Sequence, residues 1–349
     1  MNLKNFPERL KAARKMNGLS LQDLSDKLDN QISKQALNKY ESGLSVPDID
    51  LLSKLSKILN VSQEYFFRSN NLELGNLTFR KLSKLSAKDQ DKVVYKTKDF
   101  LERYLELEDI LGINSFFDNP LKNFIITSYA DIEYAAEKIR SEWNLGQGPL
   151  FNAIELLEDL KIKVFEINED EAFSGMSTWV GNKIPIIVLN KNKNIPLDRI
   201  RFTALHELGH LVLNLDNFSE KDQESFCHAF AGAMLIPKLR LINELGGIRG
   251  NIYLNELIAL KKQYGISIQA MIYRAKQLNL ISESYYKFFM ITFSKSGYRK
   301  KEPSEYPGLE QSNRFKQLLL RAVAEELIST SKGASLNNQK LSAFRAELF

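Results

Sequence analysis

The feature that most constrains this chain is a pair of histidines, His206 and His210, four residues apart in a strongly helical stretch. In a helix, residues at this spacing lie on the same face about one turn apart, so the two imidazoles are close enough to bind a single metal ion. The chain has one cysteine, Cys227, which excludes an intramolecular disulfide framework and a cysteine-based structural zinc site. Any metal site must therefore use histidine and carboxylate side chains. The apolar flanking residues predict that the helix is buried around this polar face: Phe202, Leu205, Leu208 and Leu211.

Glu207 directly follows the first histidine and supplies the group that a metal-dependent hydrolase needs. In this arrangement the carboxylate faces the metal-bound water, from which it can take a proton during attack and return it to the leaving amine. Zinc would lower the pKa of that water to about 7 and polarise the scissile carbonyl. Gly209 would let another element approach closely. The stretch therefore predicts a zinc-dependent metallopeptidase with Glu207 as a catalytic residue.

A catalytic zinc site has three protein ligands and one open position, so a third ligand is expected on a neighbouring element. Glu224 is the candidate, because it begins a helical segment that can return along the first helix after a polar turn. His228 lies one turn further on the same face. It could replace Glu224 as ligand, or act in catalysis by donating a hydrogen bond to an oxyanion or a carboxylate. Asp222 is a further alternative.

A short motif of this kind also arises by chance in unrelated helices. Here all three histidines of the chain fall within the segment 206–228. That grouping favours a metal site over three unrelated core histidines.

The length of 349 residues exceeds what one core normally reaches, so two or three packed units are expected. Hydrophobic residues make up 44% and charged residues 26%, and no apolar run approaches the ~18 residues needed to span a bilayer. The N-terminal segment is amphipathic and lacks a signal core, which predicts a cytoplasmic protein. The net charge of +5 is too small by itself to argue for nucleic acid.

Residues 6–67 have the pattern of five short helices separated by turn signals. Ser20 and Ser33 are predicted N-caps, because each hydroxyl can accept a hydrogen bond from a free backbone N–H of the following turn. Gly43 is a predicted end of the third helix. This pattern predicts a helical domain over residues 1–69.

A linker with a long charged helix over 89–111 is expected within residues 70–128. Its apolar positions alternate at spacings of four and three, and comprise Phe100, Tyr104, Leu107 and Leu111. Such a seam could support a partner helix and hence a homodimer, but it is shorter than two heptads. Packing onto a neighbouring domain is the other interpretation.

Residues 129–280 read as a domain of mixed structure, with strands over 162–167, 176–180 and 184–189 between helical segments. Residues 281–349 form a C-terminal domain of unknown role, with a strand over 288–293, a basic loop and a final helix over 313–329. The predicted fold class is α+β and mostly helical. It combines an N-terminal five-helix bundle, a linker helix, a domain with a small sheet and a helical C-terminal region.

Residues 201–211, RFTALHELGHL, resemble the signature of the ImmA/IrrE metallopeptidase family. Residues 224–231, ESFCHAFA, followed by MLIP at 234–237, are similar to the second motif of that family, whose leading glutamate completes the zinc site. The likeness covers roughly 129–280. It implies a zincin-like endopeptidase that cleaves a regulatory protein, commonly a helix-turn-helix repressor, in response to stress or DNA damage.

The N-terminal domain resembles the Cro/C1-type (XRE) helix-turn-helix domain, with ISKQALNKYESG at 32–43 as its recognition segment. Recognition helices read the major groove from their first turns. Gln35 and Asn38 can pair with adenine edges, and Lys34 with guanine or phosphate. Ser33 and Lys39 are expected to contact the DNA backbone.

Arg14 or Lys15 of the first helix could join those backbone contacts. One copy of the motif reads only one half-site, so operator binding calls for a dimer. The expected partners are double-stranded operator DNA and a protein substrate, with no membrane.

Two functions follow from these resemblances. The first is a DNA-binding regulatory zinc metalloendopeptidase that cleaves a repressor, or itself, in a stress or phage-related response. The second is a helix-turn-helix regulator or antitoxin whose zinc domain is a sensor or scaffold with little peptidase activity. The presence of Glu207 favours the first, since a structural zinc site needs no general base.

Overall fold

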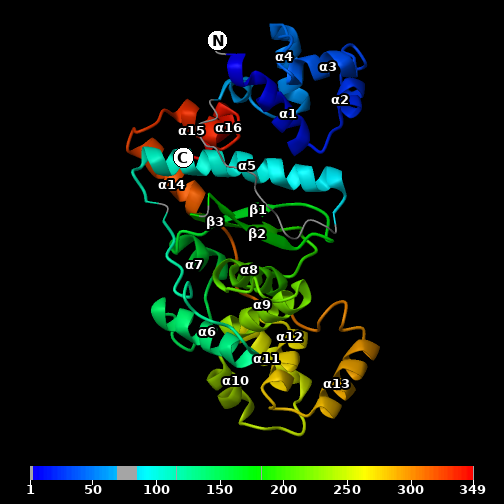
Figure 1. The fold of residues 1–349 in the computed structure, drawn as a ribbon, viewed down its shortest axis with the longest axis vertical. Helices are drawn as coiled ribbons and strands as arrows, with labels where there is room; N and C mark the ends of the chain where they lie inside the picture. The colour runs from blue at the N-terminus through cyan, green and yellow to red at the C-terminus, as the bar shows by residue number, and fades with distance from the viewer. Residues whose placement is uncertain (1–2, 69–84, 115, 182, 349) are drawn as a thin grey trace. The chain divides into compact units, whose positions relative to one another are not determined.

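The computed structural model describes residues 3–68, 85–114, 116–181 and 183–348, and the chain divides into two compact units (Figure 1). Unit 1 comprises Met1–Ser115 and Asn313–Phe349, and unit 2 comprises Phe116–Ser312. Unit 2 is therefore inserted in the sequence of unit 1. The segment 281–349, expected as one C-terminal domain, is divided between the two units. Positions 70–84 of the expected linker lie outside the described residues.

The N-terminal part of unit 1 forms the expected helical bundle. Ser20 and Ser33 are confirmed as N-caps, because their side chains accept hydrogen bonds from the backbone N–H groups of Asp23 and Ala36. The fifth predicted helix is a 3-10 segment. The elements are α1 (Phe6–Met16), α2 (Leu21–Lys27), α3 (Lys34–Glu41), α4 (Ile49–Ile58) and η2 (Gln63–Phe67), after a short η1 (Leu3–Asn5). Their core includes Leu10, Leu24, Leu37 and Leu55.

Helix α5 (Ala87–Ile110) uses its apolar seam inside unit 1. The rings of Phe100 and Tyr104 lie 5.7 and 5.6 Å from that of Phe315 on α14 (Arg314–Ala324). Tyr104 is only 1% exposed. The structure therefore supports packing within the unit rather than a partner helix. The helix predicted over 313–329 ends earlier and is followed by α15 (Thr330–Leu336) and α16 (Leu341–Ala346).

A buried carboxylate, Asp99, fixes the C-terminal helices to α5. It accepts hydrogen bonds from Arg103 Nε and Asn338 Nδ2, each at 2.9 Å. Burial opposes its ionisation, but the charges of Arg103 and Arg68 outweigh that effect and lower its pKa. The helices that follow unit 2 in the sequence thus pack on α5, which precedes unit 2, and complete the core of unit 1.

Unit 2 is built on a three-stranded sheet with the order β1-β3-β2. The strands are β1 (Lys163–Ile167), β2 (Gly175–Val180) and β3 (Ile184–Asn190); β1 pairs parallel and β2 antiparallel with the central β3. These strands confirm the predicted ones, and the α+β, mostly helical class is also confirmed. The helices are α6 (Tyr129–Glu142), α7 (Ala153–Asp159), α8 (Leu197–Val212), α9 (Glu220–Leu235), α10 (Lys238–Leu245), α11 (Leu254–Tyr264), α12 (Ile268–Gln277) and α13 (Glu283–Lys295).

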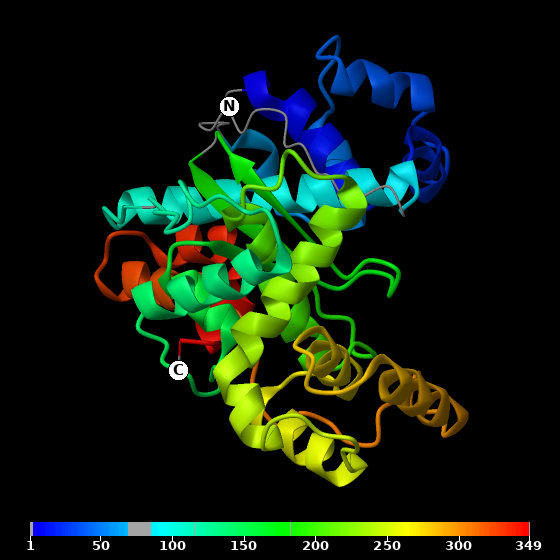
Figure 2. The ribbon, with the colours of Figure 1, turned by 60° about the horizontal axis from the view of Figure 1, so that its bottom comes forward.

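The strand predicted over 288–293 is wrong, because these residues lie in α13 at the periphery of unit 2 (Figures 1 and 2). Ser282 caps this helix by accepting a hydrogen bond from the backbone N–H of Tyr285. Phe289 and Phe293 are buried at helical spacing, whereas Phe288 is 65% exposed. The apolar run therefore has a period of four rather than the alternation of a strand. None of the described helices has the length and apolarity to cross a membrane.

The segment after α13 anchors α8 through two buried acidic residues. Glu310 pairs with the fully buried Arg201 of α8 and accepts hydrogen bonds from the first two backbone N–H groups of α7. Burial raises the pKa of Glu310, against the opposing effect of Arg201. Lys261 bridges Glu302 at 2.7 Å and Asp198 of α8 at 3.1 Å. The first turns of the histidine helix are thus fixed at two points.

Candidate metal centre

Helix α9 returns along α8 at very short range. A Cβ atom placed on Gly209 would lie 3.2 Å from Cys227 Sγ and 3.2 Å from Phe230 Cδ1, both of α9. Contacts this short leave almost no room for a side chain. The close approach expected at Gly209 is therefore present, and it brings the residues that follow Asp222 beside the two histidines.

Gly209→Val is expected to lower the free energy of unfolding by about 1–3 kcal/mol, the usual cost of overpacking a core. The measurement is urea denaturation of the full chain. Gly232→Ala is the matched control in α9, since its Cβ would meet Arg274 Cδ at an ordinary 3.4 Å. Alanine favours helix over glycine by about 0.5–1 kcal/mol, so this control should not destabilise. Equal stability of the valine variant and the wild type would contradict the packing argument.

The three predicted metal ligands bring their donor atoms together. His206 Nε2 lies 3.2 Å from His210 Nε2 and 3.4 Å from Glu224 Oε2, and His210 Nε2 lies 3.3 Å from Glu224 Oε1. Donors that surround a tetrahedral zinc ion at ~2.0–2.1 Å are about 3.3–3.4 Å from one another. The spacing and the chemistry of these donors therefore fit zinc, with one coordination position left open.

His228 lies beside this group. His206, Glu224 and His228 also offer donor atoms within 4.8 Å of one another, so a ligand set that includes His228 can be drawn as well. The set with His210 has the tighter spacing. His228 Nδ1 lies 2.6 Å from the carbonyl oxygen of Glu224, which can only accept. Nδ1 is therefore the protonated nitrogen, and His228 could donate to an oxyanion only with a second proton on Nε2.

Asp222, the other alternative ligand, is engaged at the start of α9. Its Oδ2 accepts a hydrogen bond from Ser219 Oγ at 2.6 Å, and its backbone N–H donates to the same hydroxyl. Ser219 is thus the N-cap of α9 and Asp222 is the residue that this cap contacts. The engagement favours Glu224 over Asp222 as the third donor.

Glu207 is held by a residue that the sequence analysis does not identify. Ser177 Oγ of β2 donates a hydrogen bond to Glu207 Oε2 at 2.8 Å. Strand β2 can come this close because of Gly175, where a Cβ would lie 2.7 Å from Thr203 Cγ2 of α8. The only sequence signal for Ser177 is its place between Met176 and Thr178, whose burial puts Ser177 on the other face of the strand.

The centre opens toward solvent on the side of α9. The side chain of His206 is 7% exposed and that of His210 16%, whereas that of Glu224 is 41% exposed. Glu207 is 3% exposed as a residue. The donor atoms are therefore accessible to solvent from the Glu224 side, whereas Glu207 is shielded.

The candidate DNA contacts all lie on the exposed side of the third helix. The exposed residues are Ser33, Lys34, Gln35, Asn38 and Lys39. The proposed role of Arg14 as a phosphate contact is not supported. Arg14 is buried, and its Nε and Nη2 donate to the Glu41 carboxylate at 2.6 and 2.7 Å. Lys15 pairs with Asp91 of α5.

Comparison with known protein families agrees with both parts of the chain. A helix-turn-helix model matches residues 10–66. A model of the IrrE N-terminal-like domain of the M78 peptidases matches residues 157–276. The chain thus has the fused architecture that its sequence motifs predict.

Two relatives from Bacillus subtilis (strain 168) are similar over a short stretch. The SPbeta prophage-derived HTH-type transcriptional regulator YonR is 40% identical over 68 residues, which are 20% of this chain and 61% of the relative. The HTH-type transcriptional regulator YqaE is 38% identical over 68 residues, which are 20% of this chain and 57% of the relative. The chain therefore spans less than two thirds of the length of either relative.

Proposed function

We propose that this chain, which joins a helix-turn-helix segment to an M78 peptidase-like domain, is a DNA-binding regulatory zinc metalloendopeptidase. Its proposed substrate is a helix-turn-helix repressor, or a copy of the chain itself, in a stress or phage-related response. The observation that carries the proposal is the spacing of the donor atoms of His206, His210 and Glu224, with Glu207 next to His206 in the same helix. A structural metal site would not require that fourth residue.

In this proposal His206, His210 and Glu224 hold the ion and leave one position open. Zinc, when bound, supplies a water of lowered pKa and polarises the scissile carbonyl. Ser177 donates a hydrogen bond to Glu207 Oε2 and so orients the carboxylate, which would take the proton of the attacking water and pass it to the leaving amine. His228, if doubly protonated, would donate to the developing oxyanion.

The edge strand β2 would orient the substrate. Only its inner edge pairs with β3, and no strand of the described residues pairs with its outer edge. An extended peptide can add to such an edge through main-chain hydrogen bonds. Pairing at β2 would place a peptide bond close to Glu207, because Ser177 of that strand contacts it.

A second candidate function is a transcriptional regulator in which the metal domain senses or supports without cleaving. The names of the two relatives support transcriptional regulation and say nothing of the metal domain. The two functions separate in one experiment. The purified, zinc-loaded chain is incubated with a helix-turn-helix repressor, and the products are identified by mass spectrometry. A defined cut that a chelator abolishes supports the peptidase, and an intact repressor supports the sensor.

Lys34→Ala combined with Gln35→Ala is expected to weaken specific operator binding. Loss of one bidentate base contact costs about 1–3 kcal/mol, or roughly 5- to 150-fold in affinity, and loss of Lys34 adds to it. The measurement is a gel shift with operator DNA at fixed salt.

The matched control is Lys57→Ala combined with Gln63→Ala, at two exposed positions of the same bundle outside the third helix. It should bind the operator as the wild type does. An unchanged gel shift for the variant at 34 and 35 would remove the recognition-helix assignment.

A further inference from the structure

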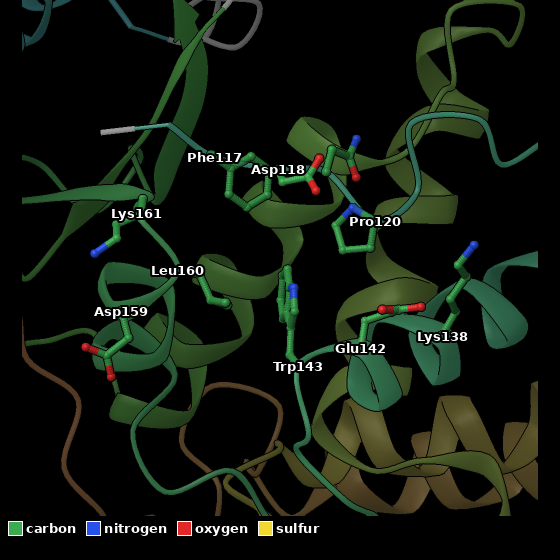
Figure 3. Close-up of a pocket in the computed structure, with 10 residues that line it drawn as sticks. Phe117, Asp118, Pro120, Lys138, Glu142, Trp143, Asp159, Leu160 and Lys161 are labelled. Atoms are coloured by element: carbon green, nitrogen blue, oxygen red, sulfur yellow. The ribbon is translucent and has the colours of Figure 1, made fainter. Parts of the chain in front are cut away.

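A second hollow in unit 2 lies apart from the metal donors. It is bounded by the loop 117–120, the end of α6 and the turn between α7 and β1 (Figure 3). Its volume is about 610 Å³, within the range of ~300–1,000 Å³ typical of small-molecule sites. The described residues that line it include none of the metal donors and not Glu207.

Apolar and aromatic side chains form one part of the wall of this hollow, beside polar and charged ones. Phe117, Pro120, Trp143 and Leu160 surround it in Figure 3. Phe117 is 5% exposed, whereas Trp143 is only half-buried and presents more of its ring. Such walls favour a flat aromatic group, which can stack on the rings and replace water there.

The charged side chains that line the hollow sum to one net negative charge. No hydrogen bond or ion pair joins Asp118 to another residue that the structure describes. Lys138 and Glu142 are one turn apart on α6, so their opposite charges offset one another. Asp159 and Lys161 also line the hollow, and their opposite charges offset one another in the same way. The remaining negative charge of Asp118 favours a cation.

We propose that this hollow binds a small aromatic amine, with its ring against Phe117 and Trp143 and its ammonium group against Asp118. An aromatic acid would meet repulsion at Asp118, and an aliphatic amine would leave the aromatic walls without a partner. The hollow is thus a ligand site separate from the metal centre.

Two contacts connect this site to the elements that carry the proposed catalytic residues. Asn119 Nδ2 donates a hydrogen bond to the carbonyl oxygen of Val212, the last residue of α8, at 3.0 Å. The Phe117 ring lies 5.9 Å from that of Trp179 on β2, two residues after Ser177. Occupancy would therefore act on both sides of Glu207. This regulatory role rests on the proposed function, whereas binding itself does not.

The chain has two tryptophans, Trp143 in the hollow and Trp179 in contact with its wall. Indole fluorescence of the full-length, zinc-loaded chain therefore reports occupancy directly. The probe is 2-phenylethylamine, whose ring does not absorb at the red edge of indole absorption. We expect a saturable change, and binding weaker by up to about fivefold for neutral 2-phenylethanol and anionic 3-phenylpropionate.

Asp118→Asn should remove the preference for the amine, while the control Asp109→Asn, at an exposed aspartate of α5 that does not line the hollow, should keep it. Trp143→Phe leaves Trp179 as the reporter and should reduce the signal. Three outcomes overturn the proposal: no saturable change, equal binding of the three compounds, or equal effects of the two aspartate variants. Glu207→Gln should bind the amine as the wild type does, so failure of this site and failure of the peptidase assignment are distinguishable.

Discussion

Glu207→Gln is expected to lower the rate of repressor cleavage by about 10²–10⁴-fold, the usual contribution of a general base. The amide keeps the size of the side chain and can still interact with Ser177, which now donates to Glu207 Oε2 at 2.8 Å. It cannot accept the proton of the attacking water. Zinc content should be unchanged, because Glu207 is not among the three donors. Mass spectrometry of the co-expressed repressor and elemental analysis of the purified chain measure the two effects.

Glu220→Gln is the matched control for this variant. Glu220 is an exposed glutamate in the first turn of α9, one turn before Glu224. It should cleave at the wild-type rate. Cleavage that persists in Glu207→Gln would show that the general-base assignment is wrong, whatever the metal content.

Glu224→Gln is expected to weaken zinc binding by more than about 100-fold. Removal of outer hydrogen bonds around a zinc ion already costs 10–100-fold, and this variant removes a charged ligand itself. The thermal stabilisation of the chain by added zinc should shrink accordingly, because a ligand stabilises the folded state in proportion to RT ln(1 + [L]/Kd). Competition with a chromophoric chelator measures the affinity, and thermal unfolding with and without zinc gives an independent value.

Asp222→Asn provides the control, since Asp222 is an acidic residue of the same helix that is bonded to Ser219. It should retain wild-type zinc affinity. The opposite pattern, loss of zinc in Asp222→Asn and retention in Glu224→Gln, would exchange the two assignments. Loss of zinc in His228→Ala with retention in His210→Ala would instead favour the donor set that includes His228.

Much of the fold was predictable because its signals are local. Ser20 and Ser33 mark helix starts by their own hydroxyl groups, and the buried run at 184–189 has the composition of a central strand. His206 and His210 needed only helical spacing to be placed together. Glu224 lies on a second helix, so its approach to the two histidines depends on how α9 packs against α8. The sequence indicated that packing only through the polar turn between the two helices.

The remaining features depend on contacts between distant segments. Ser177 reaches Glu207 because Gly175 lets β2 approach α8, which no local pattern encodes. Arg14 looks like an exposed cation in sequence, but Glu41 neutralises it in the bundle. The run 288–293 is apolar enough for a strand, and only its packing shows a helical period.

Because unit 2 is inserted in the sequence of unit 1, the two parts of unit 1 are synthesised at different times and remain in contact if unit 2 is cleaved. During translation the apolar seam of α5 leaves the ribosome long before Phe315, so it stays uncovered until the whole inserted unit has been made. A single backbone cut inside unit 2 would break the chain between α5 and α14. The two fragments would still be held together by the non-covalent packing of these helices. Proteolysis in that unit would change the connectivity of the regulator without separating its two ends.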